Sequence, residues 1–279
     1  MLAVALGLAA SLSWGVSDFL GGLKSRTLAL LTVLVFSQGI GLLLIAAIVG
    51  ARGRPAPDLE HVLYACLSGV AGVIGLAAFY RGLAVGAMAV VAPISGTAAA
   101  IPVAFGLIIG ERPGALQGIG IVLAIAGVAL ASRELPEEGG PPRVATGAGL
   151  ALLSALGFGF FFVAMDAASD RDVFWAIFFN RATSFSILIL AALAIRPRLA
   201  VERTDLRDLV AIGALDISAN ALFAAGTTQG LVSVVAVLAS LYPVVTVLLA
   251  RVVLGERVRR LQEAGVVAVL AGVALISAG

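Results

Sequence analysis

Apolar residues gather along the chain in ten runs, separated by short stretches that hold most of the charged residues. Each run is close to the ~20 residues that a helix needs to cross the hydrocarbon core of a bilayer. The runs are rich in Ala, Leu and Gly and do not alternate with a period of two, so strands are not indicated. The pattern predicts an all-α integral membrane protein of about ten transmembrane helices, at about 3–20, 28–50, 61–83, 87–109, 114–132, 147–165, 173–195, 207–227, 231–253 and 262–278.

The composition agrees with a membrane protein and argues against several other classes. Of the 279 residues, 61% are hydrophobic and 12% are charged, and the mean hydropathy is +1.12, whereas soluble domains are about 25% charged. The single cysteine, Cys66, allows neither an intrachain disulfide nor a cysteine-based metal site. The chain has no GxxxxGK[ST] phosphate-binding loop and no zincin motif. We therefore expect no metal or cofactor, and no nucleic-acid partner.

The chain contains an internal repeat. The tripeptide GER at 110–112 recurs at 255–257, and 13 of 23 positions are identical between 110–132 and 255–277. A polar stretch rich in Pro, Gly and charge separates the two copies, which is typical of a linker. We divide the chain into a first five-helix repeat at 1–132, a linker at 133–146 and a second five-helix repeat at 147–279.

An odd number of helices in each repeat has a topological consequence. The second repeat must enter the membrane from the side opposite to the first. Inverted repeats of this kind are typical of secondary carriers, which bind their substrate near the bilayer midplane at the interface of the repeats. The repeat therefore favours a carrier over other classes of membrane protein.

Several short motifs lie at corresponding places in the runs. They are Trp14-Gly15 in the first run, FYRGLAVGAMAVVAPI at 79–94, the two GER tripeptides, and Gln-x-x-Gly leading into the fifth and tenth runs. In these motifs the whole chain resembles the EamA family of the drug/metabolite transporter superfamily. The resemblance implies a ten-helix carrier of the inner membrane, of a kind often thought to export metabolites or amino acids. The chain departs from the family at Ser37-Gln38, where members often have arginine; Asn180-Arg181 holds the matching place in the second repeat.

Two criteria for orientation disagree. Loops on the side of the termini hold four basic residues, Arg52, Arg54, Arg112 and Arg171, while loops on the other side hold eleven. The positive-inside rule then places the termini outside the cytoplasm. The family resemblance implies that the termini are cytoplasmic.

Charged side chains inside apolar runs are the first candidates for a site, because an unpaired charge in a membrane is costly. Asp216 lies about midway along the run 207–227, and Asn220 follows four residues later on the same helix face. Arg181 lies at a similar depth in the run 173–195, next to Asn180. These residues either line a substrate cavity or, for Asp216 and Arg181, form a structural ion pair. In a cavity, Asp216 would bind a cationic group or a coupling proton, and Arg181 would bind a carboxylate or phosphate.

Amphipathic aromatic and amide side chains are the second group of candidates. Trp14, Gln38, Tyr80 and Tyr242 each combine an apolar body or stem with a polar tip, which suits contact with a solute. The alternatives are core packing for Trp14 and an interfacial position for Tyr80. We interpret Asp18, near the end of the first run, as a solvated end or a gate.

Two glutamates and three prolines in or near the runs are interpreted structurally. Glu111 and Glu256 each precede a new run, where a carboxylate would cap the free N–H groups of the helix that follows. Pro93, Pro102 and Pro243 lie inside runs and are expected to kink or break those helices.

Three functions stay open at this point. The first is a carrier of a small polar solute, with a proton as the candidate coupling ion; independently of function, Gly114 and Gly118 form a small-residue face that either packs helices within the monomer or makes a homodimer contact. The second is a lipid flippase or scramblase, which needs a polar groove open to lipid. The third is an intramembrane enzyme, for which no cluster of catalytic groups can be assembled from the sequence.

Overall fold

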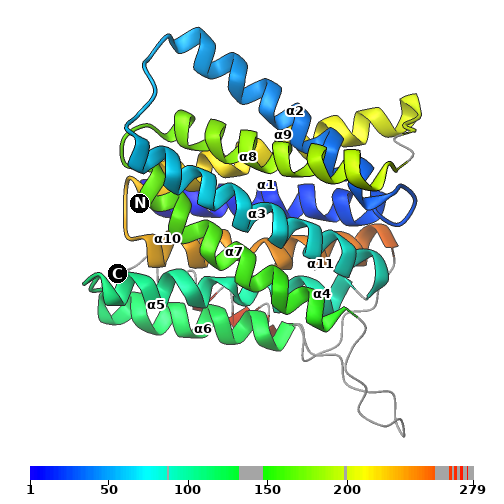
Figure 1. Cartoon of the computed structure of the whole chain (residues 1–279). Helices are drawn as coiled ribbons and strands as arrows, with labels where there is room; N and C mark the ends of the chain where they lie inside the picture. The colour runs from blue at the N-terminus through cyan, green and yellow to red at the C-terminus, as the bar shows by residue number, and fades with distance from the viewer. Residues whose placement is uncertain are drawn as a thin grey trace, which may run out of the picture.

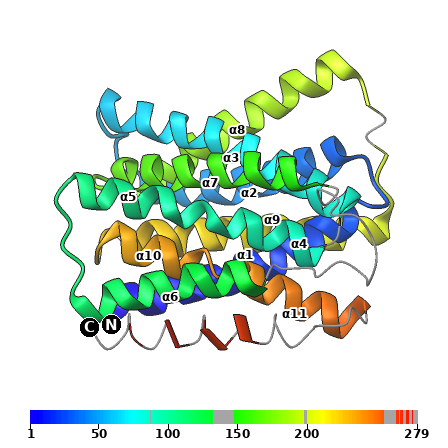
Figure 2. The same cartoon turned by 90° about the horizontal axis from the view of Figure 1, so that it is seen from below.

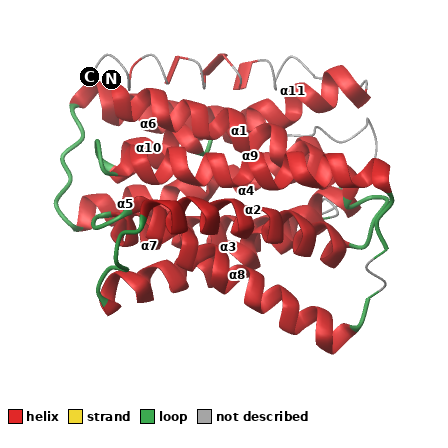
Figure 3. Ribbon diagram, turned by 90° about the horizontal axis from the view of Figure 1, so that it is seen from above, coloured by secondary structure: helices red, strands yellow, loops and turns green. Residues whose placement is uncertain are grey.

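The computed structural model describes residues 1–86, 88–131, 147–197 and 200–254, together with single positions between 264 and 275. Throughout this part of the chain the regular structure is helical, without a strand, which confirms the predicted all-α class (Figures 1 and 3). The elements are α1 (Leu2–Lys24), α2 (Leu30–Arg52), α3 (Leu59–Val85), α4 (Met88–Gly96), the 3₁₀ turn η1 (Thr97–Ala99), α5 (Ala100–Ile108), α6 (Ala115–Ala131), α7 (Ala148–Ser169), α8 (Val173–Ile195), α9 (Arg203–Thr227), α10 (Val232–Ala239) and α11 (Tyr242–Leu254).

Within the described residues, nine of the ten predicted runs coincide with helices. Seven segments are long and apolar enough to cross a membrane, with α10 and α11 counted as one, and the fourth and fifth runs form shorter apolar helices. The tenth run, 262–278, and the linker at 133–146 lie mostly or wholly outside the described residues. The structure therefore supports a multi-pass membrane protein, while the number ten is not confirmed.

Two of the runs are interrupted at matching places in the repeat. The fourth run passes from α4 through η1 to α5, and the ninth passes from α10 to α11 through Ser240 and Leu241. Each interruption lies just before a proline, Pro102 or Pro243, which has no N–H to donate to the carbonyl four residues earlier. The expected breaks thus occur at these two prolines, whereas α4 continues through position 93.

The two halves interlock instead of forming separate bundles (Figure 2). Helix α3 of the first half packs mainly on α7 of the second, and α1 packs in the same way on α9. The repeat relates α1 to α7 and α3 to α9, so these two contacts are equivalent under an inverted two-fold relation. The contact of α3 with α7 is very close, because a methyl group on Gly157 would lie 2.7 Å from the Cα atom of Gly75.

The role of Glu111 differs from the prediction. Its carboxylate does cap a helix, but it accepts hydrogen bonds from the backbone N–H groups of Val232 (2.7 Å) and Ser233 (3.3 Å), at the start of α10 in the other half. The helix that follows in sequence, α6, begins only at Ala115, and there the Gln117 side chain accepts from the Gly114 N–H instead. The corresponding Glu256 lies outside the described residues.

Candidate functional site

A small cavity lies where the two halves meet, in the middle of the bundle. Its volume of about 50 Å³ has room for a few water molecules, at ~10–15 Å³ each. Side chains from both halves line it. Its polar lining consists of Asp18, Gln38, Asn180, Arg181, Ser184, Asp216 and Asn220, and its aromatic lining of Trp14, Phe158, Phe161, Phe162 and Tyr242.

Asp216 is the centre of the polar network. Its Oδ2 atom lies 2.8 Å from Nη2 of Arg181, and the two residues are only 7% and 3% exposed. The carboxylate also accepts hydrogen bonds from the Trp14 indole N–H (3.1 Å) and the Gln38 amide (3.3 Å). The Asn220 amide donates to the Asp216 backbone carbonyl at 2.7 Å and lies 3.4 Å from its Oδ1 atom. Both residues of the ion pair, Arg181 and Asp216, therefore lie in the second half of the chain, and the first half contributes the neutral hydrogen-bond donors.

Arg181 is held less completely than its partner. One of its terminal nitrogens pairs with Asp216 and the other donates to the side-chain carbonyl of Gln38. Its Nε atom, and the hydroxyl of Tyr242 across the lining, are buried without a hydrogen-bond partner among the described residues. A buried donor without a partner is unfavourable. The hydrogen-bonding capacity of both atoms is therefore not used within the described residues.

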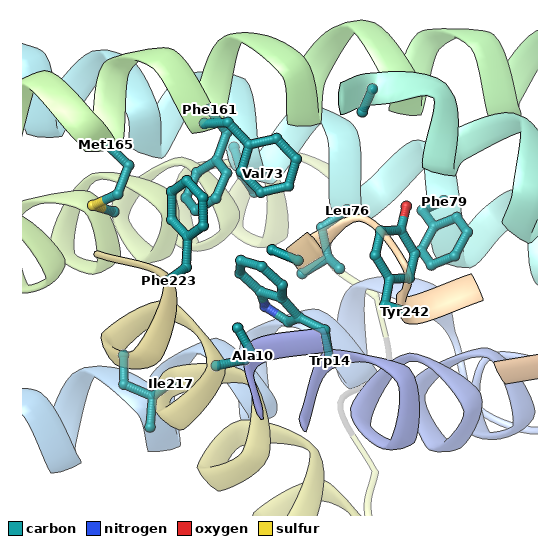
Figure 4. Close-up of a cluster of buried hydrophobic side chains, with 14 of the residues drawn as sticks. Ala10, Trp14, Val73, Leu76, Phe79, Phe161, Met165, Ile217, Phe223 and Tyr242 are labelled. Atoms are coloured by element: carbon teal, nitrogen blue, oxygen red, sulfur yellow. The ribbon is translucent and has the colours of Figure 1, made fainter. Parts of the chain in front are cut away.

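Aromatic side chains form a wall next to the polar network, and Figure 4 shows Trp14, Phe161 and Phe223 gathered in one buried cluster. The ring centroid of Trp14 lies 6.1 Å from that of Phe161 and 5.9 Å from those of Phe162 and Phe223. Packing between these rings fixes the indole so that its N–H points at Asp216. The apolar rings lower the local dielectric constant around the ion pair, which strengthens its electrostatic interaction.

Seven of the eight predicted site residues line this cavity: Trp14, Gln38, Asn180, Arg181, Asp216, Asn220 and Tyr242. The eighth, Tyr80, is only 1% exposed, so it is not an interfacial residue as the alternative interpretation held. It is not among the lining residues of the cavity, and its hydroxyl lies near the side chains of Asp18 and Ser17. The amide of Asn180 donates to the Ser68 hydroxyl at 2.8 Å, which joins α8 to α3.

Of the two interpretations of Asp18, the solvated end is wrong, while the gate stays a prediction. Its residue exposure is 4%, and its side chain lines the cavity. Helix α1 continues to Lys24, beyond the end of the predicted run, and this places Asp18 well inside the helix. The spacing of four residues from Trp14 is the signal that would have placed both on one face.

The remaining lining residues were not predicted, because their types are common in every apolar run. Phe158, Phe161 and Phe162 come from α7, and Ser184 comes from α8, where its hydroxyl donates to the carbonyl of Gly69 at 2.9 Å.

No group of His, Cys, Asp and Glu that could hold a metal ion is found in the part of the chain that was described. The arrangement suits binding of a small solute that carries charge and hydrogen-bonding groups.

Comparison with known proteins agrees with this architecture. The model of the EamA-like transporter family matches residues 1–133 and again 145–278. The chain belongs to the EamA-like transporter family. A solved structure described as "Crystal structure of protein" is similar to this chain, with a TM-score of 0.73 and 20% sequence identity. The match covers 98% of this chain and 95% of the other. A likeness at so low an identity supports the fold alone. A search of the curated proteins gives no match.

Membership of the EamA-like family establishes the general function. The chain is a multi-pass membrane protein of the drug/metabolite transporter type, which moves small solutes. Its two matched segments are the two copies of the repeat, and the cavity described above lies between them.

Proposed function

We propose that this EamA-like protein is a secondary transporter that exports a small polar metabolite, an amino acid or a similar amine-bearing solute, across the inner membrane by alternating access. One observation carries the proposal: the Arg181–Asp216 pair, with its unpartnered Nε atom, is buried in a cavity between inverted repeats. Opposite charges side by side suit a solute that has both an acidic and a basic group.

The proposed cycle is a rocking movement of two five-helix halves, 1–132 and 147–279, joined by the linker at 133–146. The second half includes the predicted tenth run at 262–278, which lies mostly outside the described residues. The cavity holds only a few water molecules when closed, so a solute the size of an amino acid requires the halves to separate. Inverted repeats supply two equivalent openings, one to each side of the membrane.

Ion pairs between the halves close both ends of the interface. Arg52 at the end of α2 forms two hydrogen bonds of 2.8 Å with Asp172, just before α8. At the opposite end of the bundle, Lys24 pairs with Asp205 at 2.9 Å and with Asp208 at 2.7 Å. Opening one side requires only the pairs of that side to break. In the proposed cycle, the described conformation, which has both sets of ion pairs formed, is the closed step.

The alternative of a lipid scramblase receives no support from the described surface. A groove of about 680 Å³ runs between α3, α5 and α7, but its lining is apolar apart from the hydroxyl of Tyr64. A lipid headgroup needs polar contacts along its path, which this groove does not supply. A homodimer is compatible with the start of α6. A methyl group on Gly118 would meet no atom within 4 Å, and one on Gly114, just before the helix, would meet only the Gln117 side chain, at 3.9 Å.

Counterflow in proteoliposomes tests the function. Vesicles loaded with one unlabelled solute are diluted into a trace of the same labelled solute, for a panel of amino acids, amines, sugars and nucleosides. We expect saturable uptake for one class, chiefly amine-bearing solutes. Asp216→Asn and Arg181→Ala should abolish it, while Glu111→Gln, which alters only a helix cap, should retain most of it at equal amounts of folded protein.

The result that contradicts the proposal is equally definite. If no class exchanges through folded wild-type protein while labelled lipids cross the bilayer, the protein moves lipid. If exchange occurs and both cavity variants retain it, the solute passes elsewhere and the site is wrongly assigned.

A further inference from the structure

We infer that Asp18 carries the coupling proton of this transporter, and that the proton exchanges there with the cationic group of a solute. The inference rests on the proposed transport function. It starts from the fact that the cavity contains two carboxylates, Asp18 and Asp216, but one cationic side chain, Arg181, among the residues that line it.

The two carboxylates have different surroundings. Asp216 lies 2.8 Å from Arg181 and accepts from Trp14 and Gln38, so its negative charge is compensated. Asp18 takes part in none of the ion pairs found among the described residues. The nearest polar side chain of α3 is the neutral hydroxyl of Tyr80. Asp216 is therefore a fixed anion, whereas Asp18 has no resident counter-charge.

The groups that face Asp18 from the neighbouring helices do not change this balance. They are Tyr80 from α3, Asp216 from α9 and Tyr242 from α11, with Arg181 of α8 committed to Asp216. Helix α10, which also packs on α1, consists of Val, Ser, Ala and Leu. If Asp18 were ionised in the closed cavity, the lining would hold one uncompensated negative charge next to a second carboxylate.

Burial of an uncompensated charge is strongly unfavourable, and a carboxyl group avoids it by binding a proton. In the closed, solute-free cavity Asp18 is therefore a neutral acid. A solute that brings a positive charge supplies the same compensation. One proton and one cationic group thus compete for one carboxylate.

The competition couples transport to the proton gradient. When the cavity opens to the side that holds the solute, the O–H bond of Asp18 breaks, the proton leaves to water, and the carboxylate pairs with the ammonium group. On the other side the ammonium leaves and the carboxylate takes a proton from water. One proton moves inward for each cationic solute that moves outward, and Asp216 keeps its charge throughout.

Asp18→Asn separates this coupling from transport itself. In proteoliposomes, we use the solute that shows counterflow with wild-type protein and compare counterflow with accumulation driven by a pH gradient. Because Asp18→Asn also removes the partner of the ammonium group, we expect its counterflow to need a higher solute concentration for half-saturation. At saturating solute, its accumulation driven by the pH gradient should be at least tenfold lower than that of the wild type, and its counterflow should no longer depend on pH. The matched control is Asp166→Asn, which removes a partly buried carboxyl on α7 that does not line the cavity; it should retain both. Accumulation that survives in Asp18→Asn overturns the inference.

A second measurement does not depend on transport. The infrared difference spectrum between wild type and Asp18→Asn, recorded at neutral pH in solute-free vesicles, should contain the carbonyl band of one protonated carboxylic acid. The difference spectrum between wild type and Asp166→Asn should not contain this same band. If the band is missing, Asp18 is ionised and the inference is wrong, even if Asp18→Asn has lost all exchange. Absence of counterflow in the wild type with the band present would instead refute the transport function and leave a proton-binding carboxyl.

Discussion

Removing Asp216 and removing Arg181 should lower the free energy of unfolding by different amounts. The contacts that each remaining partner keeps predict which loss is larger. In Asp216→Asn the buried Arg181 keeps only the carbonyl of Gln38 as a charge-stabilising partner. Removing one partner of a buried pair costs about 3–5 kcal/mol. In Arg181→Met the carboxylate of Asp216 keeps Trp14, Gln38 and Asn220 as donors. Hydrogen bonds contribute about 1 kcal/mol each, so we expect this variant to lose less, about 1–3 kcal/mol.

The double variant Arg181→Met/Asp216→Asn removes both charges together. It should be more stable than either single variant, because no isolated charge stays buried. The free energy of unfolding is measured in mixed micelles by titration with a denaturing detergent, and counterflow is measured on the same preparations. We expect stability to recover in the double variant and transport to stay absent.

The matched control is the Arg52–Asp172 pair at the end of the bundle, where the side chains are 23% and 13% exposed. Removing it through Arg52→Met should cost about 1 kcal/mol or less. Two results would refute the reasoning. A fully stable Asp216→Asn would mean that Arg181 is not a buried cation, and transport by the double variant would mean that the pair only joins α8 to α9.

Three further predictions test other parts of the structure. Glu111→Ala should lower the free energy of unfolding by about 1–2 kcal/mol through loss of the α10 cap, and Glu111→Gln by less; equal stability of both to wild type would exclude the cap. The hydrogen bond from Arg52 lowers the pKa of Asp172. This carboxylate therefore stabilises the fold above about pH 4, and the stabilisation is lost as the pH falls through the lowered pKa. In Asp172→Asn, which keeps the α8 cap, the melting temperature should fall less on acidification than in the wild type. Gly157→Ala should abolish the yield of monodisperse protein in size-exclusion chromatography, because its methyl group meets backbone at 2.7 Å, while Gly50→Ala, with nothing within 4 Å, should not.

The sequence predicts helices well here because the membrane imposes the pattern. An apolar run of about 20 residues has few other structures open to it in a bilayer. Asp216 and Arg181 are equally visible, since a charge inside such a run is exceptional. The interruptions before Pro102 and Pro243 follow from the missing N–H of proline.

The parts that the sequence does not predict depend on contacts between distant segments. Asp18 was misplaced because the apolar run ends four residues before the helix does. Glu111 was assigned to the next helix in sequence, but its actual partner, α10, lies about 120 residues away. The aromatic wall of α7 consists of residues that are ordinary in any membrane helix, and only the packing shows that they face Asp216.

The interlocked halves have a consequence for biosynthesis. When the first five helices have entered the bilayer, the Ser68 hydroxyl and the Gln38 amide still await Asn180 and Asp216, and the surface of α3 around Gly75 still awaits α7. A nascent chain that stops at this stage presents polar groups and an open groove to lipid, which are features that membrane proteases can recognise. Two fragments produced from a gene that is split in the linker should therefore survive only when both are made in the same cell.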